Sequence, residues 1–166
     1  MEIVIKNPLS EDFESKSKAE VLQEIEPQVA EMMDEHLKKR KLWFPSDFLS
    51  EDEIRNLELL RDRARGIDDS VRVSVTLGLL TEEGLPHFHR LIATYLGDES
   101  VWKTWNSIWT AEEDRHGGIL RDYARDSRLF NFKCVEIMQY AYQESGFRPD
   151  WDKDPYRVFA YTSLQE

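Results

Sequence analysis

The sequence predicts an all-α protein that folds as a helical bundle, and three observations support this prediction. Apolar residues recur at steps of three and four over most of the 166 residues, which is the spacing of one face of a helix. Only seven Gly and six Pro are present, and they lie where helices should begin, end or bend. No segment shows the alternation of apolar and polar residues that is typical of a strand. The expected helix lengths suit a bundle, and the chain length fits one domain.

The first predicted helix follows an irregular arm of residues 1–17 and runs from about Lys18 to Leu42, within the bundle of residues 18–166. Pro27 falls inside this helix and lacks the backbone N–H that a helix interior needs. We therefore expect a short helix, a break, and then Pro27 in the first turn of a longer helix. A basic run closes the segment and would complement the negative end of the helix dipole. It consists of Lys38, Lys39, Arg40 and Lys41.

The second predicted helix begins at a capping box and ends at Gly66. In this motif the Ser50 hydroxyl and the Glu53 carboxylate satisfy free N–H groups at the start of the helix. The residues that we expect to face inward are Ile54, Leu57 and Leu60.

The third predicted helix runs from about Asp69 to Leu96, and Gly97 stops it. It is apolar on nearly all sides over residues 71–80, which predicts the central and most buried helix. Pro86 lies inside it, but the apolar pattern resumes afterwards. We therefore expect a kink at Pro86 and not an end.

Three further helices complete the prediction. The fourth runs from about Ser100 to Arg125, and the fifth from about Ser127 to Glu144, with Gly146 as its stop. Asp154 and Pro155 are typical of a helix cap followed by a first helical residue, so they predict the start of a sixth helix.

The composition argues against several classes of function. The chain has 22 Lys and Arg against 33 Asp and Glu, and its net charge of -11 argues against general nucleic-acid binding. No apolar run approaches the ~20 residues of a membrane span. A single cysteine, Cys134, forbids an internal disulfide and indicates the cytosol; we expect it to be buried. The first residues match neither a signal nor a transit peptide, which favours a bacterial cytoplasm over a plastid.

The fourth helix carries the clearest chemical signal, because an acid and a histidine interrupt its apolar stripe. The stripe consists of Trp102, Trp105, Trp109, Glu113, His116, Leu120 and Tyr123. A carboxylate buried without a partner is costly, so a partner must be supplied. Glu-x-x-His places Glu113 and His116 on adjacent turns, pointing the same way, as one metal ion requires. The alternatives are a hydrogen-bonded pair without metal, or two surface residues on a face that is wrongly assigned as inward.

Two other predicted helices offer an inward acid, Glu82 and Glu166. Carboxylate di-metal sites in four-helix bundles need one Glu from each of two helices and Glu-x-x-His from each of the other two. This chain supplies both single Glu residues but only one Glu-x-x-His. Glu112 lies one step off the stripe, so we expect it to be solvated or to support the site from behind.

Four segments together resemble the soluble acyl-acyl carrier protein desaturases: LWFPSDFL (42–49), TEEGLP (81–86), WTAEEDRHG (109–117) and DPYRVFAYTSLQE (154–166). These are ferritin-like di-iron enzymes that insert a cis double bond into a fatty acyl chain held on acyl carrier protein. The resemblance therefore implies a ferritin-like bundle and an oxidoreductase of fatty acid biosynthesis. Two departures from the family pattern are Asp114, where Asn is usual in the plant enzymes, and Gly84, where Ala is usual.

The resemblance also implies roles for particular residues. The implied iron ligands are Glu82, Glu113, His116 and Glu166. Trp43 would belong to a hydrogen-bonded chain toward the histidine ligand, and Thr81 would lie near the substrate channel. The implied partners are acyl carrier protein, a ferredoxin-type electron donor and a second copy in a homodimer. The basic run at 38–41 would then be a docking patch for the acidic carrier protein, as the alternative to a solvated helix end.

Family members are about twice as long as this chain, and the missing half carries the second Glu-x-x-His. The resemblance thus implies a bundle truncated after the start of the sixth helix, with an incomplete iron site. Two other interpretations remain open: a ferritin-like oxidase with another substrate, and a non-catalytic helical interaction module with an empty site.

Overall fold

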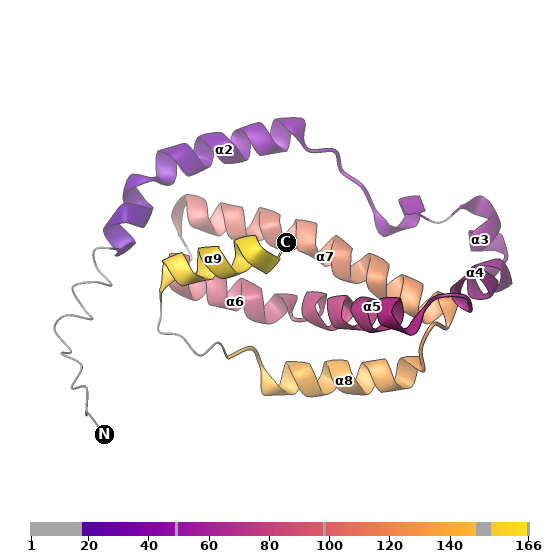
Figure 1. Cartoon of the computed structure of the whole chain (residues 1–166). Coiled ribbons are helices and arrows are strands. Elements are labelled where there is room, and N and C mark those ends of the chain that lie inside the picture. The colour runs from indigo at the N-terminus through magenta and orange to yellow at the C-terminus, as the bar shows by residue number, and fades with distance from the viewer. Residues whose placement is uncertain (1–17, 49, 98, 149–153, 166) are drawn as a thin grey trace, which may run out of the picture. The chain divides into compact units, whose positions relative to one another are not determined.

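The computed structural model describes residues 18–48, 50–97, 99–148 and 154–165, and every regular element in these ranges is helical (Figure 1). The all-α prediction is confirmed. The predicted arm of residues 1–17 and the predicted ligand Glu166 lie outside the described residues. The chain divides into two compact units, and each is described by itself; the single domain expected over residues 18–166 stays a prediction.

Of the described residues, the first unit contains 18–40, 91–97, 99–106 and 154–165. Residues 18–24 are helical, Ile25 forms a turn, and α2 (Glu26–Lys39) follows with proline in its first turn. The predicted break before Pro27 is therefore confirmed. The end of α6 (Leu85–Leu96), the start of α7 (Ser100–Ser127) and α9 (Pro155–Gln165) complete the unit.

Trp102 anchors the first unit. Its side chain is buried, its indole N–H donates to the Leu22 carbonyl at 3.2 Å, and its ring centroid lies 5.5 Å from that of Phe159. Asp154 begins α9 as predicted, because its Oδ1 accepts from the Tyr156 N–H at 2.9 Å. The helix beginning at residue 18, α7 and α9 are thus tied together within this unit.

The second unit contains residues 41–90 and 107–148. It includes the 3₁₀ turn η1 (Pro45–Phe48), α3 (Glu51–Arg55), α4 (Leu57–Ala64), α5 (Asp69–Glu82) and α8 (Phe132–Ser145), with parts of α6 and α7. Its core joins α5, α7 and α8 through Leu79, Ala124 and Val135, which are almost fully buried. Leu120, Phe130 and Phe132 pack against these three residues.

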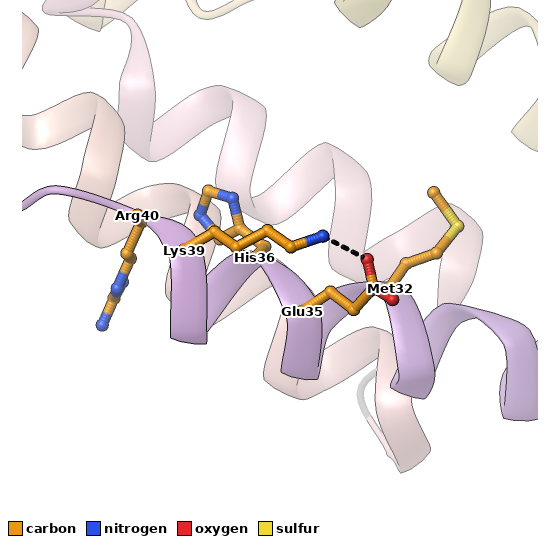
Figure 2. A pocket seen from close by; sticks show the side chains of 5 residues that line it. All are labelled: Met32, Glu35, His36, Lys39 and Arg40. Carbon is orange, nitrogen blue, oxygen red and sulfur yellow. Dashed lines mark hydrogen bonds and ion pairs between the residues drawn. The ribbon is translucent and has the colours of Figure 1, made fainter.

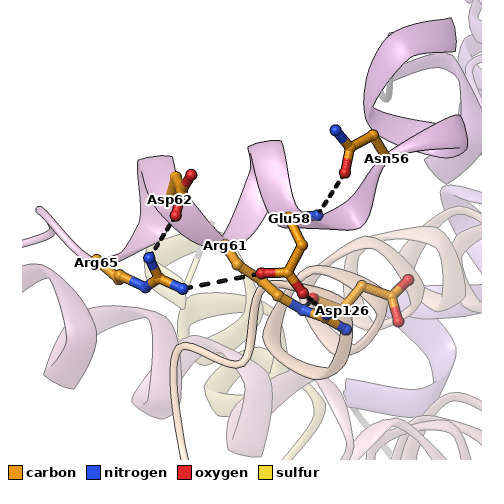
Figure 3. A network of polar contacts seen from close by, with 6 residues as sticks. All are labelled: Asn56, Glu58, Arg61, Asp62, Arg65 and Asp126. Atoms are coloured by element: carbon orange, nitrogen blue, oxygen red, sulfur yellow. Dashed lines mark hydrogen bonds and ion pairs between the residues drawn. The ribbon is translucent and has the colours of Figure 1, made fainter.

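The capping box before α3 is confirmed. The Ser50 Oγ accepts from the Glu53 N–H, and the Glu53 carboxylate accepts from the Ser50 N–H, both at 3.2 Å. The predicted second helix is nevertheless divided at Asn56, whose Oδ1 accepts from the Glu58 N–H at 3.2 Å and so caps α4 (Figure 3). This break takes Ile54 out of register with the inner face of α4. Ile54 is exposed while Leu60 is buried, so the inward prediction for Ile54 is wrong.

A polar network joins α4 to the end of α7 (Figure 3). The Arg61 Nε donates to the Asp126 carbonyl at 3.2 Å, and the Arg61 guanidinium pairs with Glu58. Arg65 pairs with Asp62 and lies 3.8 Å from the Glu58 carboxylate. The short helix α4 is therefore held by charge contacts as well as by burial of Leu60.

The predicted third helix ends at Glu82 instead of bending at Pro86. The Gly84 N–H donates to the Thr81 carbonyl at 2.9 Å in a tight turn, and α6 begins at Leu85. The physical reason is that Pro86 has no N–H to donate to the Glu82 carbonyl, as a continuous helix would require, so the helix stops earlier. Gly97 ends α6 with a positive φ of 94°, as predicted.

The expectation of burial on nearly all sides is wrong for α5, whereas α6, the second half of this predicted helix, buries Phe88, Ile92 and Leu96. Leu79 is the buried residue of α5, whereas Val73 and Leu77 are 67% and 65% exposed. Burial depends on what packs against a helix, and the described residues cover α5 on one side only. The apolar character of the other sides therefore appears on the surface of this structure.

The last predicted boundaries are mostly confirmed. The prediction for α7 holds, and α8 ends before Gly146, which has a φ of 71°. However, α8 begins at Phe132 instead of near Ser127, because Arg128 adopts a positive φ of 52° that ends α7.

Cys134 is exposed, not buried as expected, since the neighbouring Val135 faces the core. Among the described residues, no helix combines the length and apolarity that crossing a bilayer requires.

Candidate metal centre

Three of the predicted ligands converge in the second unit. Glu82 at the end of α5 and Glu113 and His116 on α7 each offer one ligand atom, and these atoms lie within 4.8 Å of one another. The Glu113 Oε2 lies 2.8 Å from the His116 Nδ1. Glu113 is buried, and the other two side chains are half-buried. Sequence spacing alone brought two of them together, and the packing of α5 on α7 adds the third.

Gly117 explains how α5 and α7 approach closely at this point. A Cβ built on Gly117 would lie 3.3 Å from the Cβ of Glu82, which is tighter than ordinary van der Waals contact. The glycine that follows His116 therefore leaves room for the helix that carries Glu82. The local sequence Glu-x-x-His-Gly thus supplies both the donors and the space for a donor from another helix.

The donor set fits a metal ion such as iron. Two carboxylates and one imidazole combine hard oxygen donors with a nitrogen donor that suits iron, zinc and manganese-type ions. The buried Glu113 carboxylate also needs positive charge or hydrogen-bond donors nearby. The hydrogen-bonded pair that the sequence left as an alternative is present, and Glu82 extends it to a group of three. No other such group occurs in the residues that the structure describes.

Trp43 lies against this cluster. Its ring stacks on that of His116 with 5.7 Å between centroids and 7° between planes, and Phe48 meets it edge-on at 5.3 Å. Arg115 places its guanidinium carbon 5.0 Å from the Trp43 centroid and donates from Nη1 to the Trp43 carbonyl at 3.1 Å. The Trp43 ring thus stacks on His116, and the hydrogen-bonded chain implied by the resemblance stays a prediction. Nothing in the sequence pattern indicated the part played by Arg115.

Two other predicted residues flank the three donors. Glu112 is half-buried, and its carbonyl accepts from the Arg115 Nε at 3.3 Å. Thr81 precedes Glu82, and its hydroxyl donates to the Leu77 carbonyl at 3.0 Å within α5. Their predicted roles as supporting residue and channel residue stay predictions.

The basic run lies at the end of α2, in the first unit, and continues into Lys41. Lys38 and Lys39 are in the last turn, and both are exposed. Figure 2 shows Lys39 reaching back to Glu35, with 2.8 Å between Nζ and Oε2. A pocket of about 430 Å³ lies along this stretch and is lined by Met32, Glu35, His36, Lys39 and Arg40. The positive charges are therefore displayed beside a pocket of mixed character.

The fold and the site together define an all-helical protein with a cluster of two carboxylates and an imidazole between its helices. A sequence model of the family described as "Fatty acid desaturase" matches residues 17–166. The chain belongs to this family. The resemblance drawn from the four sequence segments is confirmed, and the membership agrees with the expected ferritin-like class.

Similar proteins are acyl-acyl carrier protein desaturases. The chain is 34% identical over 164 residues to a stearoyl-[acyl-carrier-protein] 9-desaturase, chloroplastic, of Spinacia oleracea, covering 91% of this chain and 41% of the relative. It is 33% identical over 136 residues to the putative acyl-[acyl-carrier-protein] desaturase DesA1 of Mycobacterium tuberculosis, covering 78% of this chain and 40% of the relative. The chain thus spans about two fifths of the length of these relatives.

Proposed function

We propose that this chain is the part of an acyl-acyl carrier protein desaturase that supplies Glu82, Glu113 and His116 to its metal centre. The observation that carries the proposal is the convergence of these three donors in a chain of this family. Glu166 would be a fourth ligand. A second Glu-x-x-His, needed for a complete di-iron site, would come from outside these 166 residues.

When bound, iron would supply the redox chemistry with dioxygen that the side chains cannot provide. Desaturation removes two hydrogens from adjacent methylenes. With two electrons from a ferredoxin-type donor and two protons, it reduces dioxygen to two molecules of water. The protein itself needs no nucleophile for this reaction.

The residues of this chain hold and orient the centre. Glu113 is buried within α7, so its carboxylate has little freedom to turn toward solvent. Its contact with the His116 Nδ1 at 2.8 Å fixes the imidazole ring, and Trp43 packs on the face of that ring. Together these contacts preorganise the donors before metal arrives.

The test of the proposal is product analysis. The protein, expressed with any residues encoded after Glu166, is given acyl carrier protein substrates, reduced ferredoxin and oxygen. We expect an unsaturated product, and we expect Glu113→Gln and His116→Ala each to abolish it while circular dichroism shows unchanged helix content. Retained desaturation in either variant would contradict the proposed roles of both residues.

The carrier protein would dock on the basic run. Lys38 and Lys39 are exposed at the C-terminal end of α2, and long-range attraction to an acidic partner acts mainly on the association rate. Replacing Lys38, Lys39 and Lys41 with Glu should slow association about tenfold at low salt and less at high salt. A matched control is Lys133→Glu on α8, also exposed. If the three substitutions did not change the association rate, the basic run would be only a solvated helix end.

The cytoplasmic location stays a prediction, and the relatives include both chloroplast and mycobacterial proteins. The homodimer implied by the family also stays a prediction.

A further inference from the structure

The residues directly after Glu82 are held by side chains from two other helices. The guanidinium of Arg121, on α7, donates from Nη2 to the Glu83 carboxylate. The side-chain amide of Gln143, on α8, donates to the Glu83 carbonyl. Glu83 therefore has both its side chain and its backbone tied, and its side chain is only 14% exposed.

Steric contacts restrict the same turn from the other directions. A Cβ built on Gly84 would lie 2.7 Å from the Tyr142 hydroxyl, which is too close for any side chain without a shift. Tyr142 of α8 fills the space that a methyl group at position 84 would need. Gly117 of α7 also lies close to this segment, because a Cβ built on it would lie 3.3 Å from the Cβ of Glu82.

The contacts of Arg121 and Gln143 with Glu83 are important because the preceding residue, Glu82, lines a cavity. A cavity of about 370 Å³ is lined by Glu82, Asp114, Arg121 and Gln143, among others. Glu82 ends α5, so no further helical turn fixes its backbone. The Glu82 carboxylate can stay close to Glu113 and His116 only while the backbone that carries it is held at this helix end.

We propose that Arg121 and Gln143 are positioning residues that clamp the end of α5, so that the Glu82 carboxylate stays within reach of Glu113 and His116. This inference rests on the proposed metal centre, but it concerns contacts that exist without metal. Groups that orient a ligand from behind typically change metal affinity 10–100-fold when they are lost. A half-exposed ion pair contributes little to global stability, so the effect of the clamp should be local.

The experiment compares Arg121→Gln and Gln143→Leu with a matched control, Arg125→Gln, in the full 166-residue chain. Arg125 lies one turn further along α7 and pairs with Asp122 and Asp126 on its own helix. One readout is amide hydrogen exchange over residues 80–86 in the metal-free protein. The other is the affinity for Co²⁺, followed by its visible absorption.

We expect exchange over residues 80–86 to rise about tenfold in Arg121→Gln and Gln143→Leu, and Co²⁺ affinity to fall about tenfold. The unfolding temperature should change no more than in Arg125→Gln, and Arg121→Lys should restore most of the affinity. Two results would overturn the clamp: exchange over residues 80–86 equal to that of the control, or faster exchange in all helices together with a lower unfolding temperature. Failure of the wild-type chain to bind Co²⁺ would contradict the proposed metal centre instead, and the exchange result alone would then decide the clamp.

Discussion

Trp102 and Glu113 lie on one predicted stripe of the same helix, α7, yet their surroundings are opposite. Trp102 packs among aromatic rings and uses its single polar atom on the Leu22 carbonyl. Glu113 is almost as buried, but it meets His116 and the carboxylate of Glu82. One helical stripe can therefore supply stability at one end and chemistry at the other, and the two should respond differently to substitution.

The largest expected effect on stability is at the apolar end. Trp102→Ala removes a buried indole and leaves a cavity, so it should lower the free energy of unfolding by about 3–5 kcal/mol. Urea denaturation followed by circular dichroism measures this change. The matched control is Met32→Ala in the same unit, because Met32 is 71% exposed and should change the free energy by less than ~0.5 kcal/mol. Equal effects for the two variants would show that Trp102 does not anchor this unit.

A smaller loss is expected where α5 ends beside the metal centre. Gly84→Ala forces a methyl group against the Tyr142 hydroxyl and ring, so it should lower the free energy of unfolding by about 1–3 kcal/mol. The same substitution in a Tyr142→Ala background should cost much less, because the obstructing ring is gone. A double-mutant cycle measured in urea tests this expectation. An equal cost in both backgrounds would mean that Tyr142 is not what requires glycine at position 84.

The smallest expected effect concerns the capping box. The hydrogen bond from the Ser50 hydroxyl, with that from the Ser50 N–H, lowers the pKa of Glu53 below its usual 4.5 in the folded protein. Ionised Glu53 therefore favours folding. This contribution is complete above pH 4.5 and is lost as the pH falls through the lower folded pKa.

Glu53→Gln should accordingly lower the unfolding temperature at pH 7, and its difference from the wild type should shrink below about pH 4.5. The exposed neighbour Glu51 provides the control, as Glu51→Gln removes the same charge outside the capping box. Unfolding temperatures from pH 3 to pH 7 measure the effect. If the difference in unfolding temperature between Glu53→Gln and the wild type stayed constant with pH, ionisation of Glu53 would not contribute to the acid sensitivity of this unit.

The part of the site that lies on one helix could be predicted from the sequence. Glu113 and His116 share a face of α7 because their spacing is set by helix geometry alone. Glu82 was predicted from its place in an apolar helix and from the family motif. Arg121 and Gln143 could not be predicted as supports of Glu82, because their contacts depend on how α7 and α8 pack against the end of α5.

The errors in the fold have the same origin. Val73 and Leu77 were expected to be buried from their apolar surroundings in the sequence, but no described element covers that side of α5. Ile54 was assigned to the inner face because a continuous helix was assumed across Asn56. Local capping chemistry at one residue overrode the periodic pattern.

The most direct test of the metal centre is an anaerobic Fe²⁺ titration of the purified 166-residue chain, with Glu113→Gln and Asp114→Asn beside the wild type. Asp114 is the exposed neighbour of Glu113 and serves as the matched control. We predict weak binding of no more than one Fe²⁺ per chain, lost in Glu113→Gln and kept in Asp114→Asn. Tight binding of two Fe²⁺ per chain, or binding by Glu113→Gln equal to that of the wild type, would contradict a centre built on Glu82, Glu113 and His116.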